Sequence, residues 1–339
     1  MRHAVFVKPG HVEWRETPSP SLQGTGEALV RPIVVGRCDL DVAYVHGTMP
    51  MPSGAPIGHE IIGEIVDLGE AAASRFRPGQ RVFVSAQVAC GVCPECRRGR
   101  TGRCASVPFG ASYGMGREGG FGGGLADLVR VPFAGAMMSP VPSGVDPVTL
   151  IGAADMATDA WRAVAPTLNS NPAARVLVLG GLPAVIGLYS VGLARALGSP
   201  RVLYCDQSPT RSAIAQGYGA ELVPTEALAD SGLHDLVVVA NITAAALASA
   251  FAQVAPGGSI VSVAPALDGF PELDSRALYH KGVSWTIGRP DCRPGHDGCM
   301  AAWANLGFCP DHVPTTQSTW EEAPEAWASE ALYVAAVRA

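Results

Sequence analysis

The sequence has few charged residues and no basic cluster. Charged side chains make up 16% of the 339 residues, and the formal net charge is −6. An acidic chain without a basic patch is not expected to bind nucleic acid or an anionic membrane surface. The first residues, MRHAVFVKPG, contain no apolar run before a small-residue cleavage site, so no secretory signal is expected.

Long uninterrupted hydrophobic runs are also missing. The most apolar stretch, RVLVLGGLPAVIGLYSVGLARALG at 175–198, is broken by glycine and proline and contains Arg195. Such a stretch is typical of a buried strand and helix rather than a membrane span. The chain also shows no internal repeat and no low-complexity segment. A soluble, cytoplasmic protein with room for two domains is therefore expected.

The residues that are present follow two patterns along the chain. Up to about residue 150, short strand-like runs alternate with Gly/Pro turns, as in HAVFVK, EIIGEIVDL and LADLVRVP, which predicts a β-rich domain. From about residue 175, apolar strands such as RVLVLG, RVLYCD and DLVVVA alternate with helical patterns, which predicts a doubly wound parallel sheet. The expected class is α/β. The predicted domains are 1–151 and 152–289, and 290–339 is expected to return to the first domain.

Four cysteines lie close together in CGVCPECRRGRTGRC. Cys90, Cys93, Cys96 and Cys104 form a C-x2-C-x2-C-x7-C pattern. Four thiolates within one loop can surround Zn²⁺ as a tetrahedron, and a site closed in this way has no position for substrate. The pattern therefore predicts a structural zinc. Unligated or redox-active thiols and an iron–sulfur cluster are the alternatives.

This spacing resembles the zinc-containing medium-chain dehydrogenase/reductase family, which includes alcohol and polyol dehydrogenases. The resemblance rests on the cysteine cluster, on GHE at 58–60 upstream of it, and on the nucleotide-binding pattern downstream of it. It covers essentially the whole chain. It implies a GroES-like catalytic domain, a Rossmann cofactor domain and a homodimer or homotetramer.

The resemblance also implies a catalytic zinc bound by a cysteine, the histidine of GHE and a third residue before the cofactor domain. The matching positions are Cys38, His59 and Asp155. Thiolate, imidazole and carboxylate are all good zinc ligands, and three of them leave one position open for water or an alcohol. Glu60 is expected as a neighbouring group or transient ligand. Asp41 matches an acid that would orient His59.

The sequence departs from the family where an alcohol proton is usually passed outward. Relatives carry Ser or Thr two residues after the zinc cysteine, or a histidine five residues after it. This chain has Leu40 and Ala43, neither of which can transfer a proton. Asp159 lies four residues after Asp155, so both could share a helix face. The hypothesis is that Asp159, with Thr158 or a water, transfers the proton. The alternative is that Asp159 only hydrogen-bonds the backbone or the nicotinamide ribose.

The cofactor is expected to be NAD(H). In VLVLGGLPAVIG, a glycine-rich turn lies between a strand and a helix, although it departs from G-x-G-x-x-G. Asp206 ends the next strand, where an acid hydrogen-bonds the ribose hydroxyls of NAD and repels the 2′-phosphate of NADP. Arg211 could stack on the adenine or bind a 2′-phosphate. The expected cofactor-binding residues are Gly180, Gly181, Leu182, Gly187, Asp206, Arg211 and Thr158.

Three functions are consistent with these patterns. The leading one is zinc-dependent, NAD(H)-linked interconversion of a small-molecule alcohol and its aldehyde or ketone. The missing relay leaves reduction of an iminium or activated C=C bond as an alternative, and a catalytically silent NAD-binding protein as another. The segment CRPGHDGC, with Cys292, His296 and Cys299, is predicted to be a turn and helix start rather than a third metal site.

Overall fold

The computed structural model describes residues 1–115 and 120–338. These residues form two compact units. The first comprises 1–158, 291–297 and 314–339, and the second 159–290 and 298–313. The domain boundaries expected from the sequence are 151/152 and 289/290.

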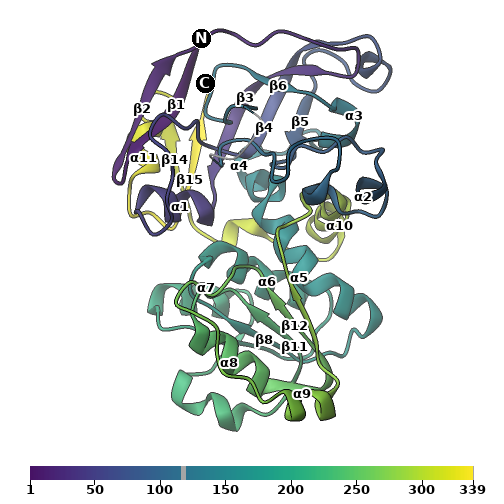
Figure 1. Cartoon of the computed structure of the whole chain (residues 1–339), viewed down its shortest axis with the longest axis vertical. Coiled ribbons are helices and arrows are strands. Elements are labelled where there is room, and N and C mark those ends of the chain that lie inside the picture. The colour runs from purple at the N-terminus through teal and green to yellow at the C-terminus, as the bar shows by residue number, and fades with distance from the viewer. Residues whose placement is uncertain (116–119, 339) are drawn as a thin grey trace. The chain divides into compact units, whose positions relative to one another are not determined.

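A seven-stranded sheet organises the first unit (Figure 1). Its strands follow the order β14, β15, β3, β4, β5 and β7, and β6 also pairs with β3. Their bounds are β3 Ala28–Arg37, β4 Glu60–Leu68, β5 Arg81–Val84, β6 Val129–Val131, β7 Met138–Pro140, β14 Thr315–Thr319 and β15 Tyr333–Val337. A separate hairpin contains β1 Arg2–Lys8 and β2 His11–Glu16. Because β15 pairs with β3, the end of the chain completes this sheet.

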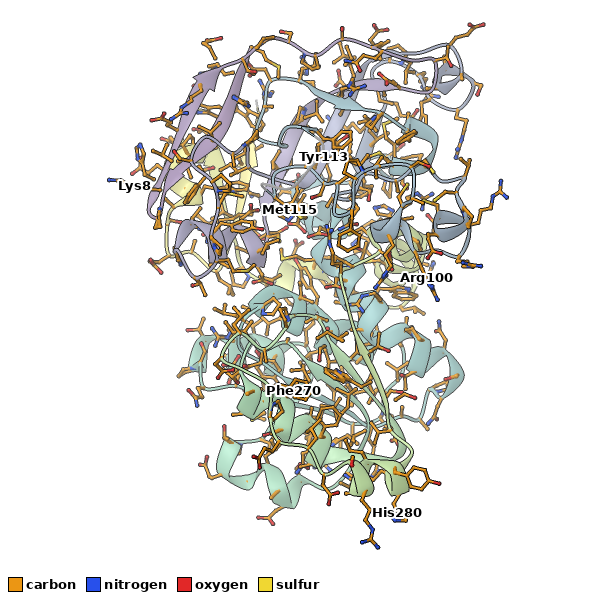
Figure 2. All side chains as sticks on the ribbon, viewed as in Figure 1. Lys8, Arg100, Tyr113, Met115, Phe270 and His280 are labelled. Carbon is orange, nitrogen blue, oxygen red and sulfur yellow. The ribbon has the colours of Figure 1, made fainter. Side chains whose placement is uncertain are left out.

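Short helices and loops complete the first unit. The helices are α1 Asp39–Val45, α2 Pro94–Arg97, α3 Ala134–Met137, α4 Pro147–Leu150 and α11 Ala323–Trp327, with 3-10 turns η1 Ala72–Ser74, η2 Thr101–Arg103 and η3 Ile151–Ala154. Tyr113 and Met115 lie on a loop inside this unit, and both are buried, whereas Lys8 points outward (Figure 2).

A buried arginine joins the last residue of β3 to the C-terminal end of α11. Arg37 has no exposed surface, and its Nη1 donates to the carbonyl oxygens of Trp327 (2.7 Å) and Ser329 (2.6 Å). Its Nη2 donates to the carbonyl oxygen of Ala331. The carbonyl of Trp327 at the end of α11 has no partner within the helix, and the guanidinium satisfies it together with two carbonyls that follow the helix. This contact fixes the chain next to Cys38.

The second unit contains a six-stranded parallel sheet in the order β10, β9, β8, β11, β12 and β13 (Figure 1). Counted along the chain, this is the strand order 3-2-1-4-5-6 of a Rossmann fold. The strands are β8 Val176–Leu179, β9 Val202–Cys205, β10 Glu221–Leu222, β11 His234–Val239, β12 Val254–Ser262 and β13 Ser284–Ile287. Strands β8 and β9 are buried at every position, as expected for apolar runs covered on both faces.

Helices surround this sheet and connect its strands. They are α6 Ala184–Ala196, α7 Pro209–Gly217, α8 Ala244–Gln253 and α9 Ser275–Lys281, with η4 Thr225–Ser231 and η5 Pro310–His312. Helices α5 Met156–Ser170 and α10 Cys292–Asn305 each begin in the first unit and continue into the second. The predicted α/β class, with a β-rich domain and a doubly wound parallel sheet, is confirmed.

Candidate metal and active site

The first unit brings together the three residues expected to bind a catalytic metal. Cys38, His59 and Asp155 each offer a donor atom, and these atoms all lie within 4.8 Å of one another. All three side chains are buried. Cys38 precedes α1, His59 precedes β4, and Asp155 follows η3. Three separate segments therefore meet at one point, as the resemblance to the family implies.

Local backbone features hold Cys38 and His59 in place. Cys38 is the N-cap of α1: its Sγ accepts from the Leu40 amide (3.2 Å), and its own amide donates to Oδ2 of Asp41 (3.1 Å). This reciprocal arrangement is a capping box, which fixes the first turn of the helix. Gly58 adopts a positive φ of 85°, which a side chain would strain, and the turn there presents His59 to the site.

Two carboxylates face the two ring nitrogens of His59. Asp41 Oδ2 lies 3.6 Å from Nδ1, and Asp155 Oδ2 lies 3.4 Å from Nε2. Burial alone lowers the pKa of His59, but the charges of these two carboxylates raise it to about 9. Asp41 thus occupies the side of the ring away from Asp155, where an acid can fix the ring orientation of a metal-binding histidine.

Glu60 lies beside the triad and is held by neighbours of its own. Its Oε1 accepts from the Met156 amide (2.9 Å), and its Oε2 accepts from the Tyr333 hydroxyl (2.6 Å). Burial and the nearby charge of Asp155 raise the pKa of Glu60 to about 8. Gly36 makes room for this carboxylate, because a Cβ at that position would lie 2.4 Å from Oε2.

The charges of this site favour a bound cation. A thiol and three carboxyl groups, from Cys38, Asp41, Glu60 and Asp155, are buried around a single imidazole. Burial, and then the charge of Asp155, raises the pKa of Cys38 well above its ordinary value. Both ring nitrogens of His59 and Oδ1 of Asp41 lack a hydrogen-bond partner. Buried acids and an unsatisfied imidazole are stabilised by a divalent ion, and sulfur, nitrogen and oxygen donors together suit zinc.

The four cysteines of the lobe, residues 90–104, form a second cluster of donors. Their sulfur atoms all lie within 4.8 Å of one another. Backbone amides point at the sulfurs: the Cys93 amide donates to Sγ of Cys90, and the Cys90 amide to Sγ of Cys104, both at 3.3 Å. Such N–H groups favour thiolates, and hydrogen bonds from backbone amides lower the pKa of Cys93 to about 6. The lobe therefore fits a structural zinc.

One contact of the triad was not expected from the sequence. The Sγ of Cys292 lies 2.8 Å from Oδ1 of Asp155 and donates to it. Cys292 is the first residue of α10, which runs through the whole segment to Asn305. The predicted helix start is therefore confirmed, but the predicted turn is wrong, because these residues already belong to the helix. The two residues are 137 positions apart in sequence, and no spacing or motif relates them.

An apolar cluster lies next to this contact. It contains Ala86, Met115 and Cys292, with Leu40 packed against them. Leu40 therefore provides apolar surface at the position where relatives carry a hydroxyl. Leu40 and this cluster therefore give the thiol of Cys292 an apolar surrounding.

The two residues proposed for proton transfer have local partners. The Thr158 hydroxyl donates to the backbone carbonyl of Asp155 (2.5 Å). Oδ1 of Asp159 accepts from Nε of Arg162 (2.7 Å), and Asp159 is buried. The first contact closes the turn that leads from Asp155 into α5. The role of Asp159 in proton transfer stays a prediction.

The glycine-rich turn after β8 is tightly packed. A Cβ on Gly180 would lie 2.4 Å from the Tyr204 hydroxyl, and one on Gly181 would lie 2.4 Å from Nδ2 of Asn241. Leu182 follows on the turn and is partly exposed. Gly187 lies inside α6, where a Cβ would lie 2.9 Å from Ala240. Its position suits close packing of the helix against the sheet, one of the roles of glycine in dinucleotide-binding units.

Asp206 lies at the end of β9 beside a cavity of about 250 Å³. The cavity is lined by the glycine-rich turn, Asp206, Arg211 and residues that follow β11, including Asn241 and Thr243. Arg211 binds Asp206 with two hydrogen bonds, at 2.6 and 2.7 Å. Burial alone raises the pKa of Asp206, but the Arg211 guanidinium holds it below its ordinary value. Asp206 is therefore an ionised acceptor at the position where a ribose is bound in related folds.

Comparisons with known proteins agree with this arrangement. Residues 24–143 match the alcohol dehydrogenase GroES-like domain. The chain is 31% identical over 273 residues to a probable zinc-binding alcohol dehydrogenase of Mycobacterium tuberculosis, covering 77% of this chain and 67% of that one. The chain belongs to the zinc-containing medium-chain dehydrogenase/reductase family.

Two further relatives extend this comparison. The structure of the alcohol dehydrogenase TADH from Thermus sp. ATN1 superposes with a TM-score of 0.88 at 29% identity, and each chain is covered completely. The glutathione-independent formaldehyde dehydrogenase of Pseudomonas aeruginosa is 30% identical over 249 residues, or 70% of this chain. This match spans 61% of the length of the formaldehyde dehydrogenase. In the described part of the chain, no helix is both long and apolar enough to cross a membrane.

Proposed function

We propose that the chain is a zinc-dependent, NAD(H)-linked oxidoreductase that interconverts an alcohol and its aldehyde or ketone. The observation that carries this proposal is the triad of Cys38, His59 and Asp155, whose donor atoms lie within 4.8 Å of one another in a buried site. When bound, zinc would polarise the substrate oxygen, and NAD(H) would accept or supply the hydride.

The residues of the first unit would prepare this site for the reaction. The carboxylate of Asp41 faces Nδ1 of His59, and Nε2 of the ring faces Asp155. Leu40, Ala86 and Met115 keep the neighbouring region apolar, and this excludes water. We propose one catalytic zinc at the triad and one structural zinc in the cysteine lobe, which would hold its loop without taking part in the chemistry.

The second unit would bind the cofactor, and its residues favour NAD(H). The ionised carboxylate of Asp206 borders the cavity, next to the turn of Gly180 and Gly181. A carboxylate there accepts hydrogen bonds from ribose hydroxyls and repels a 2′-phosphate. Arg211 is already engaged by Asp206, which leaves its guanidinium less available to a phosphate.

Proton transfer requires a group other than Leu40 and Ala43. We propose Asp159 for this role, with Thr158 or a water as the link. The test is the variant Asp159→Asn, measured for kcat across pH. Reduced activity with an altered pH profile supports the role, and full activity with an unchanged profile contradicts it.

A second function is favoured by the same missing relay. Reduction of an iminium or activated C=C bond needs no hydroxyl relay, and Leu40 supplies none. Zinc-dependent carbonyl chemistry is preferred because the triad is complete. Parallel assays with ketones and with cyclic imines, each with NADH and NADPH, separate the two. NADH binding without turnover would instead indicate a catalytically silent protein.

The proposed activity is tested by following NADH absorbance with a panel of primary and secondary alcohols. Formaldehyde is tested beside the alcohols as an aldehyde substrate, since a relative is named for it. Turnover that disappears on removal of the triad zinc and returns when zinc is restored supports the proposal. Turnover that survives loss of this zinc contradicts it.

We further propose that the chain forms a homodimer or homotetramer. Strand β13 is an edge of the parallel sheet, and Ile287 at its end is 46% exposed. An unpaired strand edge with exposed apolar surface favours self-association. Light scattering after size-exclusion chromatography tests this state. A cytoplasmic location stays a prediction, to be tested by cell fractionation.

A further inference from the structure

The two oxygen atoms of Asp155 face different partners. Oδ2 lies 3.4 Å from Nε2 of His59, on the side of the triad, whereas Oδ1 accepts a hydrogen bond from the Cys292 thiol at 2.8 Å. The side chains of Asp155 and Cys292 are almost completely buried. A carboxylate can bind a metal through one oxygen or through both, and a donor that occupies one oxygen favours binding through the other alone.

The position of Cys292 is fixed from several sides. Its amide donates to Oε1 of Gln87 (3.2 Å), and its side chain packs in the apolar cluster of Ala86 and Met115. Its thiol therefore cannot move far from Asp155 without breaking a buried hydrogen bond or opening a gap in the packing.

The residue before Cys292 ties this segment to the cysteine lobe. Oδ1 of Asp291 accepts from the Gly102 amide (2.7 Å), and its Oδ2 lies 3.3 Å from Nη1 of Arg103. Gly102 and Arg103 lie between Cys96 and Cys104 in the lobe. A continuous set of contacts thus runs from the lobe through Asp291 and Cys292 to Asp155.

We propose that Cys292 is a positioning residue. Its thiol donates a hydrogen bond to Oδ1 of Asp155 and thereby keeps Asp155 a single-oxygen ligand through Oδ2. This proposal rests on the proposed function, in which the triad binds zinc. Cys292 itself is not a ligand in this account. The sulfur donors of the triad are limited to Cys38.

The test substitutions and their control lie on the same helix, α10. Cys292→Ser keeps a donor at the same place, and Cys292→Val keeps a similar volume without a donor. Cys299→Val is the matched control. Cys299 is as buried as Cys292, at 1% exposure, and follows two turns later on α10, about 10 Å along the axis.

The experiment places cobalt in the triad of each full-length variant, with zinc kept in the lobe. The visible bands report the coordination number, the near-ultraviolet charge-transfer bands report the number of thiolate ligands, and a chelator challenge reports the rate of metal loss. We expect the wild type, Cys292→Ser and Cys299→Val to share one spectrum. We expect Cys292→Val to show weaker bands typical of higher coordination, with metal loss faster by about 10- to 100-fold.

Two results would overturn the proposal. One is a Cys292→Val protein with the wild-type spectrum and wild-type rate of metal loss. The other is loss of sulfur-to-cobalt charge-transfer intensity in Cys292→Val, which would make Cys292 a ligand. Retained lobe zinc and an unchanged circular dichroism spectrum establish that each variant is folded. If the wild type itself takes no cobalt at the triad, the proposed function fails together with this inference.

Discussion

Asp41 and His59 form a buried acid–imidazole pair, with Oδ2 of Asp41 3.6 Å from Nδ1 of His59. The same oxygen accepts the Cys38 amide at 3.1 Å. One carboxylate therefore contacts two of the three triad residues. It orients the imidazole and fixes the turn that carries the thiol, so its removal is expected to disturb both ligands at once.

The variant Asp41→Asn tests this relationship. We expect it to weaken zinc binding at the triad by about 10- to 100-fold, because an outer partner of a metal-binding histidine contributes that much. Competition with a chromogenic chelator measures the affinity. Asp39→Asn, in the first turn of the same helix, is the control and should retain wild-type affinity. Equal affinities in both variants would contradict the role of Asp41.

The pH dependence of the metal-free protein follows from two raised pKa values. His59 has a pKa of about 9 in the folded protein, against 6.5 ordinarily, and Glu60 has a pKa of about 8, against 4.5. In both cases the folded state binds protons more tightly than the unfolded state. Each contribution to stability is therefore complete below the ordinary pKa and is lost as pH rises through the raised one.

We consequently expect the melting temperature of the metal-free protein to fall steadily between about pH 5 and pH 9. The variant Glu60→Gln should reduce this fall below pH 8, because glutamine does not ionise. Its amide can still form hydrogen bonds with the Met156 amide and the Tyr333 hydroxyl. Differential scanning calorimetry with chelated protein gives the measurement. A melting temperature that rises over this range would contradict the assignment.

Arg37, the residue before Cys38, provides a test of stability that rests on the end of α11 rather than on a metal ligand itself. Arg37→Met should destabilise the protein by about 3 kcal/mol, because it leaves the buried carbonyls of Trp327 and Ser329 without a donor. Arg31→Met is the control on the same strand. Arg31 is exposed and pairs with Glu64 at the surface, so the expected cost is below about 1 kcal/mol. Denaturant unfolding of the two variants should show this difference.

Cofactor preference can be tested at Asp206. The variant Asp206→Ser removes the carboxylate and releases the Arg211 guanidinium from its two hydrogen bonds. We expect the dissociation constant of NADH to rise about tenfold, corresponding to one charged hydrogen bond, and the preference to move toward NADPH. Titration by nicotinamide fluorescence measures the dissociation constants of NADH and NADPH. Unchanged NADH binding would show that Asp206 does not contact the cofactor.

The sequence was most informative where the chemistry is local. Four cysteines within fifteen residues can meet without distant parts of the chain, and their sulfurs are clustered as predicted. The parallel sheet was equally predictable, since apolar strands buried on both faces leave a continuous hydrophobic run. The meeting of Cys38, His59 and Asp155 could be predicted only from the resemblance to a family, because no periodicity relates positions so far apart.

Contacts between distant segments could not be predicted in this way. The hydrogen bond from Cys292 to Asp155 depends on how α10 begins beside η3. The hydrogen bonds from Arg37 depend on where α11 ends. Nor did the glycine pattern show that Gly187 lies inside α6, because a glycine that permits close packing and one in a turn have the same letter. In each case the tertiary packing decides the role of the residue.

The central claim is that the triad binds a zinc distinct from the one in the lobe. Elemental analysis of zinc per chain in the wild type and in Cys38→Ala tests it most directly. We predict two zinc ions in the wild type and one in Cys38→Ala, because the four lobe cysteines are unchanged in that variant. One zinc ion in both proteins would contradict the account, since only the lobe would then bind metal.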